Sequence, residues 1–429
     1  MEQFKLIFMK FLAAGVILAA GTLLPANLLQ AATITVDPKI STLSQALQDA
    51  APGDVLSLLS GTHVGPIKID KSISITGPND AVILGNGKGN TITINASNVT
   101  ISGITVTGSG LLLETQDSGI FVSKPATNVK IIDNSILDNL IGVYMWGAKD
   151  SLVKNNRIIG RKDMRVNERG NGVQLWNAPG TIVDNNDISH GRDGIFVTTS
   201  KKNIFKNNYL HDVRFGVHYM YTDKSQVTGN ISKGNHIGFA IMFSTKITVA
   251  NNTSENDRDR GILFNYANKI LVENNKVTGG PKKCVFIYNS NKNQFLRNLF
   301  SNCQIGIHFT GGSAQNEMVE NAFIDNRTQV KYVGTRWLDW SKNGRGNYWS
   351  DHAAFDLDGD GIADAAYRPN DLTDQILWRY PSAKLLTNSP AVQLLQWAQS
   401  AFPALHPGGI IDTAPLMRPV KSSKVEHES

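Results

Sequence analysis

The sequence has little cysteine, no clustered positive charge and, after its first segment, no long apolar run. Its two cysteines, Cys284 and Cys303, lie in successive repeats but three columns apart, about 10 Å along an extended strand, so the spacing does not favour a disulfide. Lys and Arg are scattered among Asp and Glu in a basic chain of net charge +6, which argues against nucleic-acid binding. No later window is long and apolar enough to span a membrane.

Residues 1–32 are predicted to be a secretory signal. Lys5 and Lys10 precede an apolar run from about residue 11 to 29, and Ala31-Ala32 follow it before a polar segment begins. The same run is long enough to be an uncleaved membrane anchor, but the small residues at its end favour cleavage. The sequence therefore predicts export.

A short phrase of glycine followed by alternating apolar residues recurs every 22 or 23 residues, with one longer step. Cys284 takes the place of the glycine once. The glycines that begin the phrase are Gly119, Gly142, Gly172, Gly194, Gly216, Gly238, Gly261 and Gly306. A period of this length indicates a solenoid of stacked units.

A column of asparagines keeps the same period and predicts how the coils stack. Its members are Asn134, Asn156, Asn186, Asn208, Asn230, Asn252, Asn275, Asn298 and Asn321. Apolar residues at the first and third places after each glycine predict strands with one buried face, and coils too short for a crossover helix must pair in parallel. We therefore predict an all-β right-handed parallel β-helix. The asparagines should form a ladder at one corner in left-handed backbone conformation, and the glycines should supply positive φ at another.

Four segments of the mature chain are expected. Residues 33–118 should form an N-terminal cap and the first coils, and residues 119–332 the regular coils, with a basic insertion at Arg161–Arg169. Residues 333–380 should form an irregular C-terminal cap with an Asp-rich loop. Residues 381–429 should supply a helix and a tail.

Helices and further strands are predicted within the end segments. Ser41 should cap a helix over 42–50, whose apolar face covers the N-terminal end of the coils, and Ser389 should cap a second helix over 390–402. Strands are expected at 55–58, 67–69, 73–75, 92–94 and 101–106.

The outward columns of the regular coils contain no acid. The second place after the glycine holds Tyr144, Gln174, Phe196, His218, Ala240, Leu263, Phe286 and His308, and the fourth holds Trp146, Trp176, Thr198, Met220, Met242, Asn265, Tyr288 and Thr310. Asp193 and Asp259 lie near the glycines beside arginines and are expected to form salt bridges. Polysaccharide-cleaving solenoids need converging carboxylates, so an enzyme of that class is disfavoured.

His218, Met220 and Met242 predict a copper site on this outer face. His218 and Met220 should project from one strand about 7 Å apart, with Met242 one coil from Met220 at about 4.8 Å. Imidazole and thioether donors suit Cu(I). The alternative is that both methionines pack under a loop or a partner and that His218 is a solvated surface residue.

Trp146, Trp176, Tyr144 and Phe196 flank this patch and are predicted to bind a partner. Exposed aromatic residues are typical of protein interfaces. A role at the ligand site itself is the alternative.

A calcium loop is predicted at residues 356–364. Asp356, Asp358, Asp360 and Asp364, with Gly361 at the turn, match the first nine positions of such a loop. Position twelve is Tyr367 rather than Glu, so Asp351 or Asp371 would have to supply the closing ligand. We expect a structural calcium here, with an unliganded acidic turn as the alternative.

The C-terminal motifs closely resemble the NosD family of periplasmic maturation factors of nitrous oxide reductase, found in denitrifying bacteria. They are the run Gly346 to Asp351, the Asp358–Gly361 loop, Trp378 to Pro381, the segment around Gln393, and Ala414 to Met417. The resemblance covers essentially the whole mature chain.

The resemblance implies a non-enzymatic accessory protein. It would be attached to the inner membrane through an ABC transporter's membrane and ATPase subunits. It would accept transient Cu(I) from a lipoprotein chaperone and deliver it to apo nitrous oxide reductase. The predicted second helix and the apolar 410–411 and 416–417 tail would then dock on the transporter. Two alternatives are a secreted polysaccharide lyase or epimerase, and an adhesion solenoid.

Overall fold

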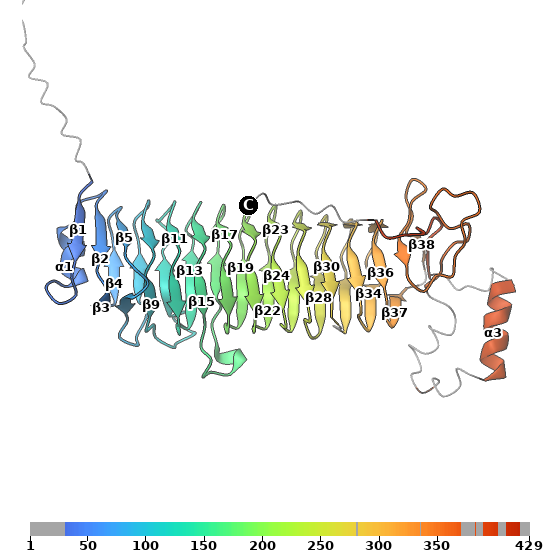
Figure 1. The fold of residues 1–429 in the computed structure, drawn as a ribbon, viewed down its shortest axis with the longest axis horizontal. Coiled ribbons are helices and arrows are strands. Elements are labelled where there is room, and N and C mark those ends of the chain that lie inside the picture. Colours follow the sequence, from blue (N-terminus) through green and yellow to red (C-terminus); the bar gives the residue numbers. More distant parts are fainter. Residues whose placement is uncertain are drawn as a thin grey trace, which may run out of the picture.

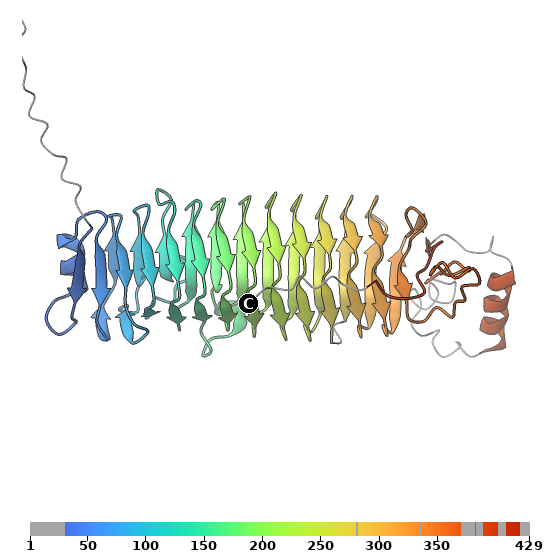
Figure 2. The ribbon, with the colours of Figure 1, turned by 45° about the horizontal axis from the view of Figure 1, so that its top comes forward.

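The computed structural model describes residues 31–279, 282–334, 336–369, 382, 389–401 and 409–420. The chain winds into a rod of parallel coils with three sheets along its length (Figures 1 and 2), which confirms the right-handed parallel β-helix. The predicted signal segment lies outside the described residues. Among the described helices, none has the length and apolarity to cross a membrane.

Each coil contributes one strand to each sheet. Sheet I has 13 strands: β1 (Thr33–Val36), β2 (Val55–Leu58), β5 (Ser74–Thr76), β8 (Thr100–Ser102), β11 (Lys130–Ile132), β14 (Leu152–Lys154), β17 (Ile182–Asp184), β20 (Ile204–Lys206), β23 (Gln226–Thr228), β26 (Thr248–Ala250), β29 (Leu271–Glu273), β32 (Gln294–Leu296) and β35 (Glu317–Val319). Sheet II has 12, mostly longer, strands: β4 (Ile67–Ile69), β7 (Ile92–Ile94), β10 (Ser118–Val122), β13 (Ile141–Trp146), β16 (Val173–Trp176), β19 (Asp193–Thr198), β22 (Phe215–Met220), β25 (Ile237–Met242), β28 (Arg260–Asn265), β31 (Lys283–Tyr288), β34 (Ile305–Thr310) and β37 (Thr328–Val333).

Sheet III closes each coil with 13 strands. They are β3 (Gly61–Val64), β6 (Ala81–Leu84), β9 (Thr105–Thr107), β12 (Ser135–Leu137), β15 (Arg157–Ile159), β18 (Asp187–Ser189), β21 (Tyr209–His211), β24 (Ile231–Lys233), β27 (Thr253–Glu255), β30 (Lys276–Thr278), β33 (Leu299–Ser301), β36 (Ala322–Ile324) and β39 (Tyr348–Trp349). The predicted strand over 101–106 is two strands, β8 and β9, because the chain turns a corner at Gly103, which has φ of 78°.

The N-terminal helix covers the first coil as predicted, but its cap is different. α1 runs from Leu43 to Asp49, and Thr42 rather than Ser41 accepts the capping bond, from the Gln45 amide at 3.2 Å. Leu43 and Ala46 are buried in the main core. The helix therefore seals apolar surface that the open end of the coil stack would expose.

The recurring glycines allow close stacking and do not supply positive φ. None of the eight has positive φ. A Cβ on Gly194 would lie 2.6 Å from the carbonyl oxygen of Gly216, and one on Gly216 would lie 2.7 Å from that of Gly238. The sequence interpretation of these positions was wrong, because the constraint acts between coils rather than within one corner.

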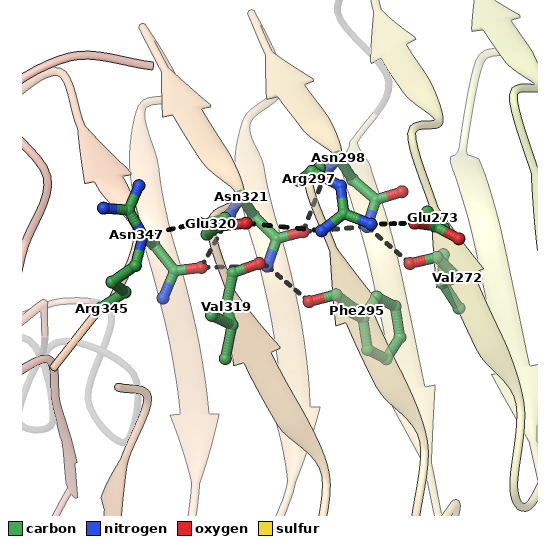
Figure 3. Close-up of polar contacts among 10 residues, drawn as sticks. All are labelled: Val272, Glu273, Phe295, Arg297, Asn298, Val319, Glu320, Asn321, Arg345 and Asn347. Atoms are coloured by element: carbon green, nitrogen blue, oxygen red, sulfur yellow. Dashed lines mark hydrogen bonds and ion pairs between the residues drawn. The ribbon is translucent and has the colours of Figure 1, made fainter. Parts of the chain in front are cut away.

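The predicted asparagine ladder is present and runs one coil further, to Asn347. At its C-terminal end the Asn298 amide Nδ2 donates to Oδ1 of Asn321 at 2.8 Å, and Asn321 repeats the contact to Asn347 at 2.9 Å (Figure 3). From Asn134 to Asn321 the left-handed residue is the one before the ladder asparagine, such as Asn207 before Asn208. Each buried amide is thereby satisfied by the next coil.

The C-terminal cap buries part of the tail that was expected to dock on a partner. β38 (Trp337–Asp339) pairs with β40 (Gly409–Ile411), and Ile410 and Leu416 are buried. The Asp412 carboxylate accepts bonds from the Trp349 indole at 2.8 Å and the Asn347 amide at 2.7 Å. These contacts tie residues 409–416 to the last coil, so this part of the tail is not a free docking element.

The predicted C-terminal helix is confirmed as α3 (Pro390–Ala401). The Ser389 hydroxyl accepts a bond from the Val392 amide at 3.4 Å, as expected of its cap. Phe402 and the run Trp378 to Pro381 lie outside the described residues.

The structure joins Cys284 and Cys303 in a disulfide, with their Cα atoms 5.7 Å apart. The spacing argument against this bond was wrong because it measured separation along an extended strand. The corner between β33 and β34 folds Cys303 back beside β31, where both sulfurs are buried.

Asp257 is a buried carboxylate in a corner position otherwise suited to asparagine. Its Oδ1 accepts bonds from the Asn235 amide at 2.8 Å and the Ser232 hydroxyl at 3.0 Å, and its Oδ2 accepts one from Ser254 at 2.5 Å. Burial raises the pKa of Asp257 to about 6, although these hydrogen bonds oppose the change.

We predict that Asp257→Asn stabilises the protein at neutral pH. Because the folded-state pKa exceeds the unfolded one, Asp257 disfavours folding increasingly as pH rises from about 4 through 6, by up to about 3 kcal/mol. Urea unfolding should show a gain for the variant that is clearly larger at pH 7.5 than at pH 4.5. The exposed Asp133→Asn is the control, and an equal gain at both pH values contradicts the prediction.

Candidate functional site

The outer face of sheet II is the broadest surface of the rod, because its regular strands are twice as long as those of the other sheets. The strand register confirms the columns expected from the sequence: Trp146 lies opposite Trp176, and Met220 lies opposite Met242. Side chains separated by 22 or more residues therefore lie one strand spacing apart on this face.

His218 is held by a buried carboxylate at the centre of this face. Its Nδ1 lies 2.9 Å from Oδ2 of Asp193, and Arg214 donates to both oxygens of the same carboxylate at 2.8 Å. The rings of Phe196 and Phe215 each lie 5.0 Å from the imidazole. His218 is only 7% exposed, so it is not the solvated residue of the alternative interpretation.

This arrangement leaves the second imidazole nitrogen available. Burial alone raises the pKa of Asp193, but hydrogen bonds from His218 and Arg214 outweigh that effect and lower it below the usual value. Asp193 thus engages the imidazole through Nδ1, which leaves Nε2 as the ring nitrogen available to a metal. That nitrogen is buried and has no hydrogen-bond partner among the described residues. A carboxylate on one ring nitrogen is the usual support for a histidine that binds metal through the other.

Met220 and Met242 are half-buried beside His218. Met242 packs against a small apolar cluster on the outer face, formed around Ile237, Ala240 and Leu263. The alternative that Met242 is a packing residue therefore holds in part. The donor set of one imidazole and two thioethers still fits a soft monovalent cation.

The predicted aromatic platform is smaller than expected and has one further member. Trp146 and Trp176, each 37% exposed, stack with centroids 5.6 Å apart, and Phe121 stacks on Trp146 at 6.3 Å. Tyr144 is only 5% exposed, so its assignment to partner binding was wrong, and Phe196 packs on His218. Phe121 was missed although it occupies the same column as Tyr144.

The carboxylates near the glycines form salt bridges, as predicted. Asp259 pairs with Arg260 at 2.8 Å and Lys282 at 3.8 Å, while Asp193 pairs with Arg214. The described strands of sheet II contain one acidic residue, Asp193. The sequence columns excluded it because it precedes the glycine, yet it lies in register with Phe215 and reaches His218.

The Asp-rich loop brings three of its four predicted ligands together. One ligand oxygen each of Asp356, Asp358 and Asp360 lies within 4.8 Å of the others. Asp364 is not in this group, since it accepts a bond from the Leu357 amide at 2.8 Å. Backbone amides, first that of Gly361, lower the pKa of Asp356.

No closing ligand reaches this loop from Asp351. The Asp351 carboxylate accepts a bond from Tyr367 at 2.8 Å and one from Gln329 at 3.2 Å. Asp371 lies outside the described residues.

Two solved structures with a similar fold are, by their titles, a mannuronan C-5 epimerase module and an exopolygalacturonase. The A-module of a mannuronan C-5 epimerase from Azotobacter vinelandii aligns with a TM-score of 0.52 at 15% identity, covering 68% of this chain and 89% of the module. A family 28 exopolygalacturonase from Yersinia enterocolitica aligns with a TM-score of 0.50 at 12% identity, covering 71% of this chain and 79% of the enzyme. At such low identity these likenesses establish the fold alone.

Sequence comparison is more specific. A family model described as "Periplasmic copper-binding protein (NosD)" matches residues 154–354. A protein from Pseudomonas aeruginosa named "Probable ABC transporter binding protein NosD" is 38% identical over 413 residues, covering 93% of this chain and 95% of the relative. One of the same name from Stutzerimonas stutzeri is 38% identical over 375 residues, covering 84% and 86%. The chain therefore belongs to the NosD family of periplasmic copper-binding proteins.

Proposed function

We propose that this protein is a non-catalytic maturation factor that accepts Cu(I) from a chaperone lipoprotein and passes it to apo nitrous oxide reductase. The observation that carries the proposal is the donor set on sheet II, in which Asp193 supports His218 beside the paired methionines. Copper is cargo here rather than a resident cofactor. Thioether ligands favour Cu(I) without imposing a strict geometry, which suits transfer between proteins.

We infer that α3 contacts the membrane part of an ABC transporter. The helix contains no charged residue, and Leu394 on it is exposed. Exposed apolar surface of this kind is typical of a docking element. The relatives' names support a transporter partner, and attachment to the inner membrane would follow from that contact.

A polysaccharide lyase or epimerase remains the alternative suggested by the fold. The one carboxylate in the strands of sheet II is committed to Arg214 and His218, so it has no acid partner within that sheet. Glycoside hydrolysis uses a carboxylate pair, and proton abstraction by a lyase or epimerase needs a base and an acid that are free to exchange protons. This arrangement supports the accessory role over the enzymatic one.

We also propose that calcium binds Asp356, Asp358 and Asp360 and stabilises the C-terminal cap. Ca²⁺ favours carboxylate oxygens from alternate positions of a tight loop. The melting temperature of the mature protein should rise with Ca²⁺ relative to chelator, by the equivalent of about 2.7 kcal/mol at 100 times the dissociation constant. Asp358→Asn should abolish the rise, whereas an unchanged melting temperature in the wild type rules out the site.

Anaerobic Cu(I) titration tests the copper donors. The triple variant His218→Ala, Met220→Leu, Met242→Leu should bind Cu(I) at least about tenfold more weakly, and Asp193→Asn about 10- to 100-fold more weakly through loss of imidazole support. His308→Ala is the control, since His308 lies in the same column without opposed methionines. Equal Cu(I) affinity of the triple variant and the wild type would rule out these three residues as the copper donors.

Deletion of the gene tests the function itself. We expect reductase purified from the deletion strain to lack most of its copper and its N₂O-reducing activity, both restored by the wild-type gene. Complementation with the triple variant separates the two proposals, because full restoration would keep the maturation role and remove the copper site. A fully loaded, active reductase in the deletion strain refutes the maturation role.

A further inference from the structure

The corner between sheets II and I carries a ladder of lysines. The five residues occupy one position in successive coils: Lys202, Lys224, Lys246, Lys269 and Lys292. All are exposed, and their φ values lie between 51° and 60°. Most other coils place Asn128, Asp150 or Gly180 at this position, residues that tolerate left-handed backbone or lack a Cβ, and the coil after Lys292 places Gln315 there.

The lysine ladder is unfavourable for the isolated chain. Its like charges recur at about the strand spacing of 4.8 Å, and each lysine adopts left-handed backbone without the usual Asn or Gly. Among the described residues, none of the five forms a salt bridge. The nearby acid Asp223 accepts a bond from Thr245 at 2.8 Å.

The same rod shows how a charged ladder is built for stability. At the corner between sheets I and III, Arg297 lies between Glu273 and Glu320, and Arg345 donates to Glu320 at 2.6 Å (Figure 3). The signs alternate there, so each charge has an opposite neighbour. The lysine ladder lacks that alternation, which indicates that its counter-charge comes from outside the part of the chain that the structure describes.

A ladder of aromatic residues runs beside the lysines. Tyr221, Phe243 and Tyr266 each precede a ladder lysine by three residues and also have left-handed backbone, with φ of 52°, 48° and 52°. Their rings stack at 5.1 Å and 5.2 Å with interplanar angles of 18° and 8°, and all three are exposed. For bulky side chains this backbone conformation is a genuine outlier of the kind found at functional surfaces.

The stacking of the three rings determines which part of each ring can contact a partner. Because the rings cover one another's faces, their edges point outward, and the edge of an aromatic ring carries its positive partial charge. A hollow of about 490 Å³ adjoins the ladder and includes Tyr221, Phe243 and Lys201 in its lining. Asp223 also lines this hollow, but the lysines outnumber it, so lysines and ring edges together form a predominantly positive surface.

We propose that this corner is a docking site for a carboxylate-rich segment of a protein partner. Five lysines span four coil spacings, about 19 Å, which matches about six residues of extended peptide. A sugar chain would stack on open ring faces, and the interior faces of this ladder are already occupied, so we favour a protein over an acidic polysaccharide. A predominantly positive surface raises the rate of encounter with an oppositely charged partner. The proposal does not rest on the copper site.

The experiment uses the mature protein and a fluorescein-labelled peptide of ten glutamates, measured by fluorescence anisotropy. Wild type should bind the peptide at low salt and lose affinity steeply as salt rises. The variant Lys224→Asn, Lys246→Asn, Lys269→Asn should bind at least tenfold more weakly. The matched control Lys88→Asn, Lys130→Asn, Lys276→Asn removes the same charge from exposed sites elsewhere and should lose less than twofold.

Stability provides a second readout that separates docking from a structural role. In this column Asn128 already donates from Nδ2 to Oδ1 of Asn98 at 2.7 Å, so asparagines should extend that ladder and relieve repulsion. The ladder variant should therefore melt at or above the wild-type temperature while losing the peptide. A lower melting temperature with binding retained overturns the proposal.

Three other results would also overturn it. The first is no binding of the peptide by wild type. The second is an equal loss in the control variant, which would reduce the effect to net charge. The third is tighter, ladder-dependent binding of an oligouronate of equal charge, which would assign the corner to a polysaccharide.

Discussion

The structure depends on the hydrogen bonding of each coil to the next at one strand spacing. Because of this contact, each residue lies next to the residue at the same position of the following coil. Every column must therefore hold side chains that can pack or hydrogen-bond with side chains of their own kind. Asparagine meets the requirement because its amide both donates and accepts, which the buried ladder from Asn134 to Asn347 uses in full. Glycine meets it where a Cβ would strike the next coil's carbonyl, as at Gly194.

The same constraint explains why the outer face of sheet II can assemble a metal-binding group. Met220 and Met242 are neighbours because their strands are paired, and Asp193 reaches His218 from the preceding coil. The buried carboxylate is stabilised by Arg214, so the imidazole is oriented by a network that does not depend on a loop. A rigid scaffold thus holds imidazole and thioether donors for Cu(I), an ion that does not require a strict coordination geometry.

The period and the columns were predictable from sequence because period-two burial and a fixed repeat length leave few topologies. Contacts between columns were not predictable. The disulfide depends on how sharply the chain turns at the corner before β34. Asp193 lies opposite Phe215 and Ile195 lies opposite Val217, while Gly194 between them has no paired residue, so the alternation of the column does not place the Asp193 side chain. Tyr144 occupied the expected column, but neighbouring side chains cover it. Column position fixes the face of a residue, whereas exposure depends on the sizes of its neighbours.

The basic insertion at residues 161–169 shows what this architecture permits over evolutionary time. It lengthens one coil, and it contains a short 3-10 helix, η1 (Val166–Glu168), yet Tyr144 and Gln174 on either side of it remain paired in register. Because each coil contacts only its neighbours, extra residues at a corner leave the remaining stack unchanged. New recognition loops can therefore be acquired one corner at a time, and a lineage can diversify its partners without redesigning the core.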